Sequence, residues 1–306
     1  MFDNIKLKIC PPPKKISLSR RIENIRHTDE NSYRGYIKNM QVYKNINCVT
    51  IYGSLPKYLQ GENITPLDRE KIKLAIKKLE GDIGFSFKNA FVCSVEFGIS
   101  VKTQEKPFEY LSLFGYPKRL TRVVFSKWNE TETVTYTSGK GSFAFTAYDK
   151  RKEMLAKKND EPPFFANSNV LRLEHKILGR KGIKAKFGRD LSAYDLFNED
   201  VYKAFQELFL KAYEDIDKMG RLVYSDKLEK LTPSRIRKLQ AEQYRQKYPN
   251  EYQYFIQGAK EAGKLSPRNL EEIRRADRKF NRDVSISDRN ILIKELDAYI
   301  LDVMAT

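Results

Sequence analysis

Residues 131–148 read TETVTYTSGKGSFAFTAY: two alternating segments joined by a turn that carries two glycines at 138–141. Alternation with period two on both sides of a glycine-containing turn predicts a β-hairpin. In the second arm, Phe143 and Phe145 point to one face, whereas Tyr148 shares the other face with small residues. The hairpin therefore predicts a tyrosine at a strand end with open space above it.

Two further stretches carry the same period. Residues 91–102, FVCSVEFGISVK, are the most regular strand pattern in the chain, and residues 169–177, NVLRLEHKI, are another. Their apolar residues fall on one face, and Glu96, Arg172 and Glu174 fall on the other. Alternation of this quality is typical of an antiparallel sheet with one buried and one open face.

The chain changes character after residue 191, where long helical patterns dominate and strand patterns nearly vanish. We expect one helix over 193–219 and no regular structure over the polar residues 17–36. The predicted fold class is α+β: a central, mostly antiparallel sheet with one open face, plus an α-helical C-terminal region. The predicted domains are residues 1–188 and 189–306.

Composition points to a polyanionic partner. The 306 residues include 57 Lys and Arg against 40 Asp and Glu, a formal net charge of +17. Such an excess favours nucleic acid as the partner, and an anionic membrane surface is the second possibility. The third is a soluble protein whose surface is basic without binding either. No apolar run approaches the roughly 20 residues that span a bilayer, and the first ten residues lack the apolar core of a signal peptide. We therefore expect an intracellular protein that does not enter the membrane.

Metal-ligand chemistry is restricted by the scarcity of histidine. Only His27 and His175 are present, and the three cysteines are isolated from one another. A metal site must therefore use mainly carboxylates, which suit Mg²⁺ or Mn²⁺ better than Zn²⁺. His175 falls on the apolar face of its strand, where a core or edge position is the expectation.

One constellation of residues matches a known type of chemistry. Tyr148 is followed at once by Lys150 and Lys152, and the neighbouring strands offer Glu96 and Glu174. A tyrosine hydroxyl that attacks a phosphodiester needs a carboxylate-bound divalent ion and cations that stabilise the developing charge. By spacing alone, each of these residues also fits a structural role, such as a packing tyrosine or a cross-strand ion pair.

Several motifs, in their order along the chain, resemble one family. VTYTSGKGSFAFTAYDKRKEM at 134–154 and VLRLEHKI at 170–177 resemble the gene II/X family of replication initiation proteins from filamentous phages and some plasmids. The stretches FDNIKLKI at 2–9, GSLPKYLQGENI at 53–64 and LSAYDLFN at 191–198 are also similar to that family. Together the motifs cover roughly the first 200 residues.

The resemblance implies a rolling-circle initiator, whose sheet would form a nuclease domain of the rolling-circle initiator and relaxase type. Such a protein nicks one strand of a circular origin, remains on the 5′ end through a phosphotyrosine, leaves a 3′ primer, and later rejoins the displaced strand, with Mg²⁺ as the expected ion. The family's Tyr-x-Lys-x-x-Glu element maps onto Tyr148, Lys150 and Glu153, and its strand carboxylates map onto Glu174 and Glu96. The paired-histidine metal motif of many rolling-circle nucleases is missing, which favours an all-carboxylate site.

The expected partners are duplex and single-stranded origin DNA, with a host helicase and polymerase, in the cytoplasm of a bacterial cell. Candidate DNA contacts are Lys140, Arg151, Arg172, Lys176, Arg235, Arg237 and Lys238. The basic C-terminal helices would hold DNA, form a dimer or dock a helicase. Two alternatives remain open: a regulator that binds DNA on the same scaffold without cutting, and a polybasic protein that binds RNA or a membrane surface.

Overall fold

The structure is a computed structural model. It describes residues 2–12, 22–115, 120–127, 130–139, 141–157, 167–218, 220–221, 232, 234, 249–269, 271–273, 288–289 and 291–305. The chain forms two compact units. One comprises Met1–Leu111, Pro117–Asp215 and Tyr299–Thr306, and the other comprises Ser112–Tyr116 and Ile216–Ala298. The division into domains 1–188 and 189–306 stays a prediction.

A large antiparallel sheet dominates the first unit. Among the described residues, ten strands follow the order β2-β3-β4-β5-β1-β6-β10-β9-β8-β7, and all neighbours are antiparallel. The strands are β1 (Phe2–Ile9), β2 (Glu23–Asp29), β3 (Ser32–Ile37), β4 (Met40–Lys44), β5 (Val49–Ser54), β6 (Phe91–Thr103), β7 (Thr121–Lys127), β8 (Glu130–Thr137), β9 (Phe143–Asp149) and β10 (Asn169–Leu178). With its helices, the sheet confirms the predicted α+β class.

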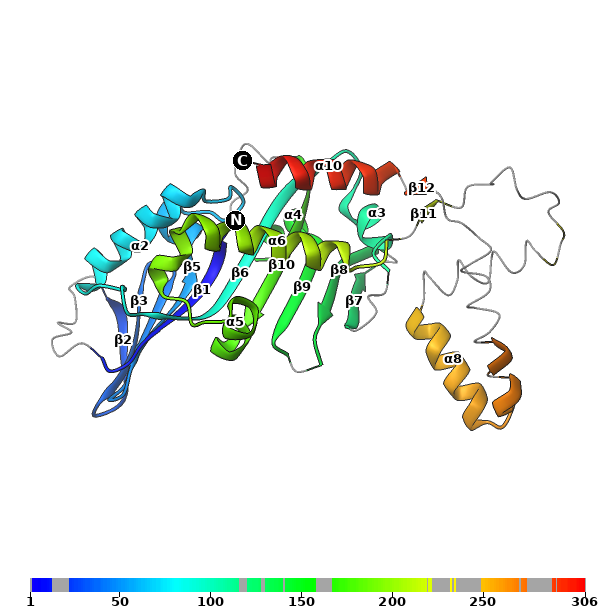
Figure 1. Ribbon diagram of the computed structural model, residues 1–306, viewed down its shortest axis with the longest axis horizontal. Coiled ribbons are helices and arrows are strands. Elements are labelled where there is room, and N and C mark those ends of the chain that lie inside the picture. The colour runs from blue at the N-terminus through cyan, green and yellow to red at the C-terminus, as the bar shows by residue number, and fades with distance from the viewer. Residues whose placement is uncertain are drawn as a thin grey trace. The chain divides into compact units, whose positions relative to one another are not determined.

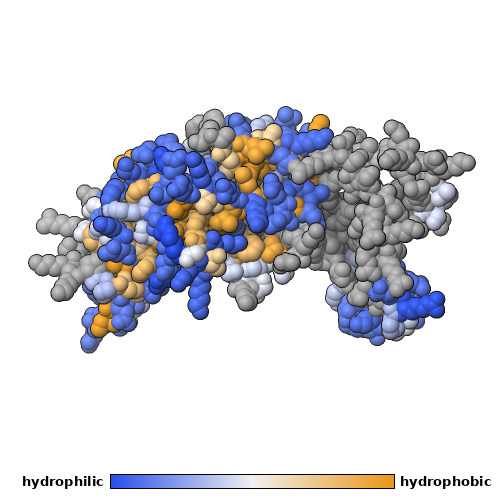
Figure 2. All heavy atoms as spheres, viewed as in Figure 1, coloured by the Kyte–Doolittle hydropathy of each residue, from blue (hydrophilic) through white to orange (hydrophobic). Residues whose placement is uncertain are grey.

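Helices cover one face of this sheet. They are α2 (Arg69–Ile83), α5 (Gly179–Phe187) and α6 (Glu199–Glu214), which lie in front of the strands in Figure 1. Phe97 of β6 and Phe145 of β9 both contact the ring of Phe209 in α6, with centroids 6.0 and 5.6 Å apart. Apolar side chains show between the helices, whose outer surfaces are mainly hydrophilic (Figure 2). The core therefore lies between the helices and this face, which leaves the opposite face for polar residues.

Capping side chains fix the helix ends. The side chain of Asp149 accepts a hydrogen bond from the Lys152 amide and starts α4 (Lys150–Ala156). The predicted single helix over 193–219 is wrong. It is divided into a 3₁₀ helix, η2 (Ala193–Phe197), and α6, because Asn198 has extended backbone and caps α6 through the Val201 amide.

The expectation of irregular structure over 17–36 is also wrong where the structure describes it. Strands β2 and β3 occupy most of residues 23–37. Every residue of β2 is exposed, since this strand is at the sheet edge and pairs only with β3. A strand without a buried face has no hydrophobic alternation, so its sequence carries no period-two signal.

The remaining elements are short or belong to the second unit. The helices α1 (Leu55–Gln60) and α3 (Pro107–Ser112) flank the sheet strands in sequence, and α10 (Ile291–Ala305) ends the chain. The second unit contains α8 (Pro249–Glu261) and a two-stranded pairing of β11 (Gly220–Arg221) with β12 (Asp288–Arg289). No helix in the described part of the chain is long and apolar enough to cross a membrane.

His175 is buried on the helix-covered face, where its ring meets the edge of Phe143 with 5.7 Å between centroids. Burial lowers the pKa of this imidazole to about 4 from an ordinary value of 6.5. The stabilising contribution of neutral His175 is thus present above pH 6.5 and lost as the pH falls toward 4.

We expect His175→Leu to flatten the fall in the free energy of unfolding between pH 6.5 and 4, measured by urea denaturation. An unchanged slope would contradict this assignment, whatever the variant's stability at pH 7.

Candidate active site

The register of three strands brings the predicted polar residues onto one face. Arg172 of β10 lies directly opposite Tyr148 of β9, and Lys176 lies opposite Glu96 of β6. Glu174 lies between these two pairs on the same side of β10. The face is the one that α6 leaves uncovered, so the sheet itself forms the floor of a polar site.

A β-bulge in β1 adds two residues that the sequence patterns did not single out. The register between β1 and β6 shifts between Phe2 and Ile5, so both of these apolar residues reach the buried face. The extra residue turns Asp3 and Asn4 toward the polar face, where the Asn4 amide donates to Glu96 Oε1 at 3.2 Å. The sequence feature that could have predicted this bulge is the three-residue spacing between Phe2 and Ile5, in a strand that otherwise alternates.

Gly98 lets the side chains of β10 extend across β6 toward β1. A Cβ at this position would lie 2.7 Å from the Leu173 carbonyl oxygen, 3.0 Å from Glu174 Cγ and 3.1 Å from Arg172 Nη2. The missing side chain thus leaves the space through which Arg172 reaches Asp3, at 3.0 Å between Nη2 and Oδ2.

We expect Gly98→Ala to destabilise the fold by about 1–3 kcal/mol, because the added methyl overpacks a site bounded by backbone. The matched control is Gly81→Ala in α2, where a Cβ would meet no atom within 4 Å. That change should be neutral or stabilise by about 0.5–1 kcal/mol. Urea denaturation of both variants measures the difference, and equal stability of Gly98→Ala and the parent chain would contradict the packing argument.

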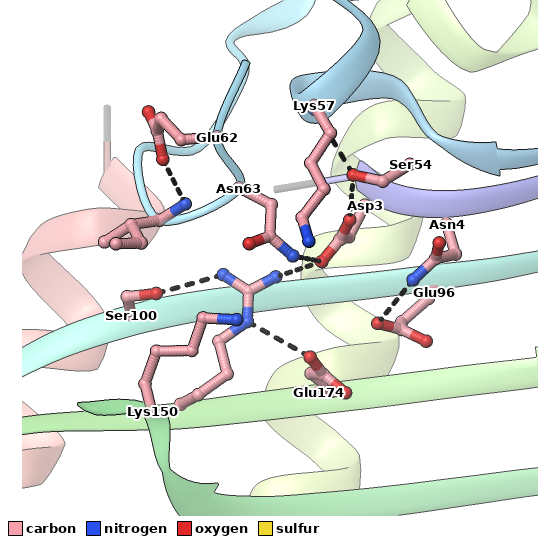
Figure 3. Close-up of polar contacts among 12 residues, drawn as sticks. Asp3, Asn4, Ser54, Lys57, Glu62, Asn63, Glu96, Ser100, Lys150 and Glu174 are labelled. Atoms are coloured by element: carbon pink, nitrogen blue, oxygen red, sulfur yellow. Dashed lines mark hydrogen bonds and ion pairs between the residues drawn. The ribbon is translucent and has the colours of Figure 1, made fainter. Parts of the chain in front are cut away.

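Three buried carboxylates form the centre of the site. Asp3, Glu96 and Glu174 each offer an oxygen, and these oxygens lie within 4.8 Å of one another (Figure 3). The guanidinium of Arg172 joins two of them, donating to Asp3 from Nη2 and to Glu174 Oε1 from Nε at 3.3 Å. Its Nη1 donates to Ser100 Oγ at 3.1 Å. Arg172 is 1% exposed, so its guanidinium is held by protein groups inside the fold.

A second layer of hydrogen bonds holds Asp3. Its Oδ1 accepts from the Ser54 hydroxyl at 2.5 Å, and its Oδ2 accepts from the Asn63 amide at 2.8 Å. Ser54 also caps α1 by accepting from the Lys57 amide. The GSLPKYLQGENI stretch therefore contributes to the site through these two residues, whereas its sequence had indicated only a resemblance.

Tyr148 donates a hydrogen bond from its hydroxyl to Glu174 Oε1 at 2.8 Å. Burial and the charge of Glu174 raise the pKa of the phenol well above its ordinary value of 10, so the hydroxyl keeps its proton. Burial also opposes ionisation of Glu174, but Arg172 and Lys176 outweigh it and lower the pKa of Glu174 to about 2. A neutral phenol therefore donates its hydrogen bond to an ionised carboxylate, which orients the hydroxyl and lies within reach of its proton.

Lys176 forms ion pairs with two carboxylates of the cluster, Glu96 and Glu174. Its Nζ lies 2.9 Å from Glu96 Oε2 and 3.0 Å from Glu174 Oε2. Burial, together with the charge of Glu174, raises the pKa of Glu96 to about 7 even with this ammonium beside it. The cluster thus holds a carboxylate that resists ionisation, and an added positive charge would stabilise its ionised form.

These residues fit a hard divalent cation. Asp3, Glu96 and Glu174 offer closely spaced carboxylate oxygens, which are the ligands that Mg²⁺ and Mn²⁺ prefer. The acidic cluster can therefore bind a metal ion, and the cation would compete with the Lys176 ammonium for Glu96 and Glu174.

The lysines that follow Tyr148 lie on different sides of it. Lys150 is 2% exposed, with its Nζ 2.8 Å from Glu153 Oε2 and 5.8 Å from the centre of the Tyr148 ring. Lys152 turns toward β8, where it pairs with Glu130 at 2.7 Å and with Glu132 at 3.3 Å. The structure thus brings Lys150, and not Lys152, beside the carboxylate cluster.

Two clefts meet at Tyr148. The larger, of about 480 Å³, contains the carboxylate cluster and extends toward β3 and β5, where Tyr36 and Tyr52 line it. The smaller, of about 380 Å³, extends toward β7 and β8. Residues that line both are Tyr148, Glu153, Lys157, Glu174 and Lys176. A chain-like ligand lying across Tyr148 would therefore enter both clefts.

Among the other predicted DNA contacts, Arg151 is described by the structure and is not among the residues that line the two clefts. Arg151 is on the surface of α4, where it donates to Asn167 Oδ1 at 3.2 Å. Lys140, Arg235, Arg237 and Lys238 lie outside the described residues. Their roles stay predictions.

Comparison with known proteins gives little further information. No protein-family model matches the chain, and no curated protein matches it in sequence. Among solved structures, the rolling circle replication initiator protein from Geobacillus stearothermophilus is similar at 9% identity and a TM-score of 0.39. The similarity covers 79% of this chain and 96% of that chain. Similarity this weak establishes neither a shared fold nor a shared function.

Proposed function

We propose that this chain is a rolling-circle replication initiator, of the kind found in the gene II/X family, that nicks and rejoins origin DNA through Tyr148. The observation that carries this proposal is the hydrogen bond from Tyr148 to Glu174, within a cluster that Asp3 and Glu96 complete. A nucleophile, a proton acceptor and a set of metal ligands thus share one open cleft. The net charge of +17 supports a polyanionic substrate.

In the proposed nicking step, the Tyr148 oxygen attacks the phosphorus of one phosphodiester. The phenolic proton passes to Glu174 as the new O–P bond forms. The bond to the 3′ oxygen breaks, and that oxygen leaves with the electron pair and takes a proton from water. The 5′ phosphate remains on Tyr148, so attack by a 3′ hydroxyl reverses the step and seals a strand.

Asp3, Glu96 and Glu174 are the residues that would hold the divalent cation, Mg²⁺ or Mn²⁺. When bound, such an ion neutralises phosphate charge and orients the group for displacement. Arg172 is proposed as a positioning residue and no longer as a DNA contact, because its guanidinium is bonded to Asp3, Glu174 and Ser100. Lys150 is the cation proposed to stabilise the transition state, with Lys176 beside the carboxylates. Lys152 is no longer proposed for this role, because it pairs with Glu130 and Glu132 on β8.

The proposed substrate is duplex origin DNA for the first cut and single-stranded DNA for rejoining, in the cytoplasm of a bacterial cell. Lys140, Arg151, Arg235, Arg237 and Lys238 remain proposed phosphate contacts. The basic C-terminal region is proposed to hold DNA or a second protein, such as a replicative helicase or polymerase.

The direct test is incubation of the whole chain with supercoiled plasmid carrying the cognate origin, with and without Mg²⁺. Conversion to open circles with protein covalently attached to the 5′ end is expected only with the cation. Tight binding without cutting would instead support a non-cleaving regulator.

Glu96→Gln is expected to weaken Mn²⁺ binding and to raise the cation concentration needed for half-maximal nicking, both by at least about 10-fold. The reason is the loss of a charged ligand, and even outer-shell partners of metals contribute about 10–100-fold to affinity. Isothermal titration with Mn²⁺ measures the first effect without DNA. Glu70→Gln is the control, since Glu70 is exposed on α2. Equal Mn²⁺ affinity in both variants would remove Glu96 from the ligand set.

A further inference from the structure

The smaller cleft has an exposed aromatic wall. Phe125 of β7 lines it and is 59% exposed. Phe125 lies directly opposite Thr133 of β8, and Thr133 lies directly opposite Tyr148 of β9. The three residues therefore form one row across the sheet, on the face that carries the carboxylate cluster. With strands about 4.8 Å apart, Phe125 is about 10 Å from Tyr148 along this row.

The lining of this cleft suits an uncharged, flat group better than a phosphate. Its floor is formed by Thr133 and Thr146, which leave space between Phe125 and Tyr148. Its charged residues are largely paired: Lys152 with Glu132 at 3.3 Å, and Lys157 with Glu153. A phosphate would gain little from lysines already neutralised in this way, whereas an uncharged flat ring can stack on Phe125 without needing an ionic partner.

We propose that Phe125 is a stacking platform for a nucleobase that flanks the phosphate attacked by Tyr148. The inference rests on the proposed function and deepens it, because it assigns the smaller cleft to a base of single-stranded DNA. The larger cleft, with its carboxylates, then holds the reacting phosphate. Stacking on an aromatic ring is tolerant of sequence, so Phe125 contributes affinity and strand placement without selecting one base.

The alternative occupant is a second copy of the chain. β7 is the edge strand of the sheet, and Val123 on the same face is 56% exposed. Exposed apolar residues on an edge strand are also suited to pairing between chains. The DNA base is favoured because Phe125 lines a cleft that includes Tyr148 and Glu174, whereas Val123 is not among the residues that line it.

The test measures binding of a fluorescein-labelled dT oligonucleotide to the full chain in the Tyr148→Phe background without divalent cation, so that no cleavage is involved. Phe125→Ala is expected to weaken binding about 5- to 150-fold, the range for loss of one stacked base. Phe125→Trp should restore it. Val123→Ala is the matched control and should leave binding unchanged. An oligonucleotide of abasic sugars should bind the parent chain and Phe125→Ala alike.

Three results would overturn the inference: equal affinity of Phe125→Ala and the parent, an equal loss for the abasic strand, or no binding by the parent. Loss of binding that coincides with conversion of a dimer to a monomer, measured by light scattering, would assign Phe125 to self-association instead. A failure of the chain to nick DNA would count against the proposed function and not against the role of Phe125. A chain that leaves origin plasmid intact yet shows the Phe125 effect is a single-strand binding protein, and only the proposed chemistry is then lost.

Discussion

Tyr148→Phe is expected to abolish nicking and covalent attachment to DNA while the fold and DNA binding persist. The change removes only the hydroxyl that donates to Glu174. Loss of a covalent nucleophile costs far more than loss of a positioning group, so we expect a decrease of at least about 10³-fold, or about 4 kcal/mol of transition-state stabilisation. Glu174 retains its partners Arg172 and Lys176, so the cost in folding stability should be about 1 kcal/mol.

The measurement is conversion of supercoiled origin plasmid to open circles, with the covalent adduct resolved by denaturing electrophoresis. Tyr136→Phe is the control, because Tyr136 is fully buried and lies opposite Phe145 on the helix-covered face. It should nick like the parent chain. Retained nicking in Tyr148→Phe would transfer the nucleophile to another tyrosine of the larger cleft, and Tyr36 and Tyr52 are the candidates there.

Removal of Arg172 is expected to have the largest effect on stability. Its guanidinium neutralises Asp3 and Glu174, which are 1% and 3% exposed. Breaking a buried ion pair from one side leaves uncompensated charge and typically costs about 3–5 kcal/mol. We therefore expect Arg172→Leu to lower the free energy of unfolding by about this amount at pH 7, measured by urea denaturation.

The pH dependence distinguishes this electrostatic cause from lost packing. In the parent chain, Arg172 helps to lower the pKa of Glu174 from 4.5 to about 2 against the effect of burial. That contribution is present above pH 4.5 and lost as the pH falls toward 2. The difference between the parent and Arg172→Leu should therefore shrink below pH 4.5. A difference that is constant with pH would indicate packing alone. Arg180→Gln, which breaks an exposed pair with Asp190, is the control and should change little.

The sequence by itself determined which residues of each strand share a face. Alternation is a local property with period two, so it placed Glu96, Tyr148, Arg172 and Glu174 on polar faces without knowledge of strand neighbours. The cap of α4 at Asp149 is equally local, because it involves only the next three residues. The edge strand β2 escaped prediction since it buries no face and so carries no periodic pattern.

Only the tertiary structure decided which of those faces meet. The order β1-β6-β10-β9 is set by pairing between segments far apart in sequence, and it makes Asp3 of β1 and Glu174 of β10 members of one cluster. The bulge that turns Asp3 inward and the gap at Gly98 that Arg172 crosses depend on register against β6. Local alternation does not say which distant strands pair or exclude a register shift of two residues, because such a shift keeps the same face buried. The proposed nucleophile could thus be chosen from the sequence, but the complete set of carboxylates around it could not.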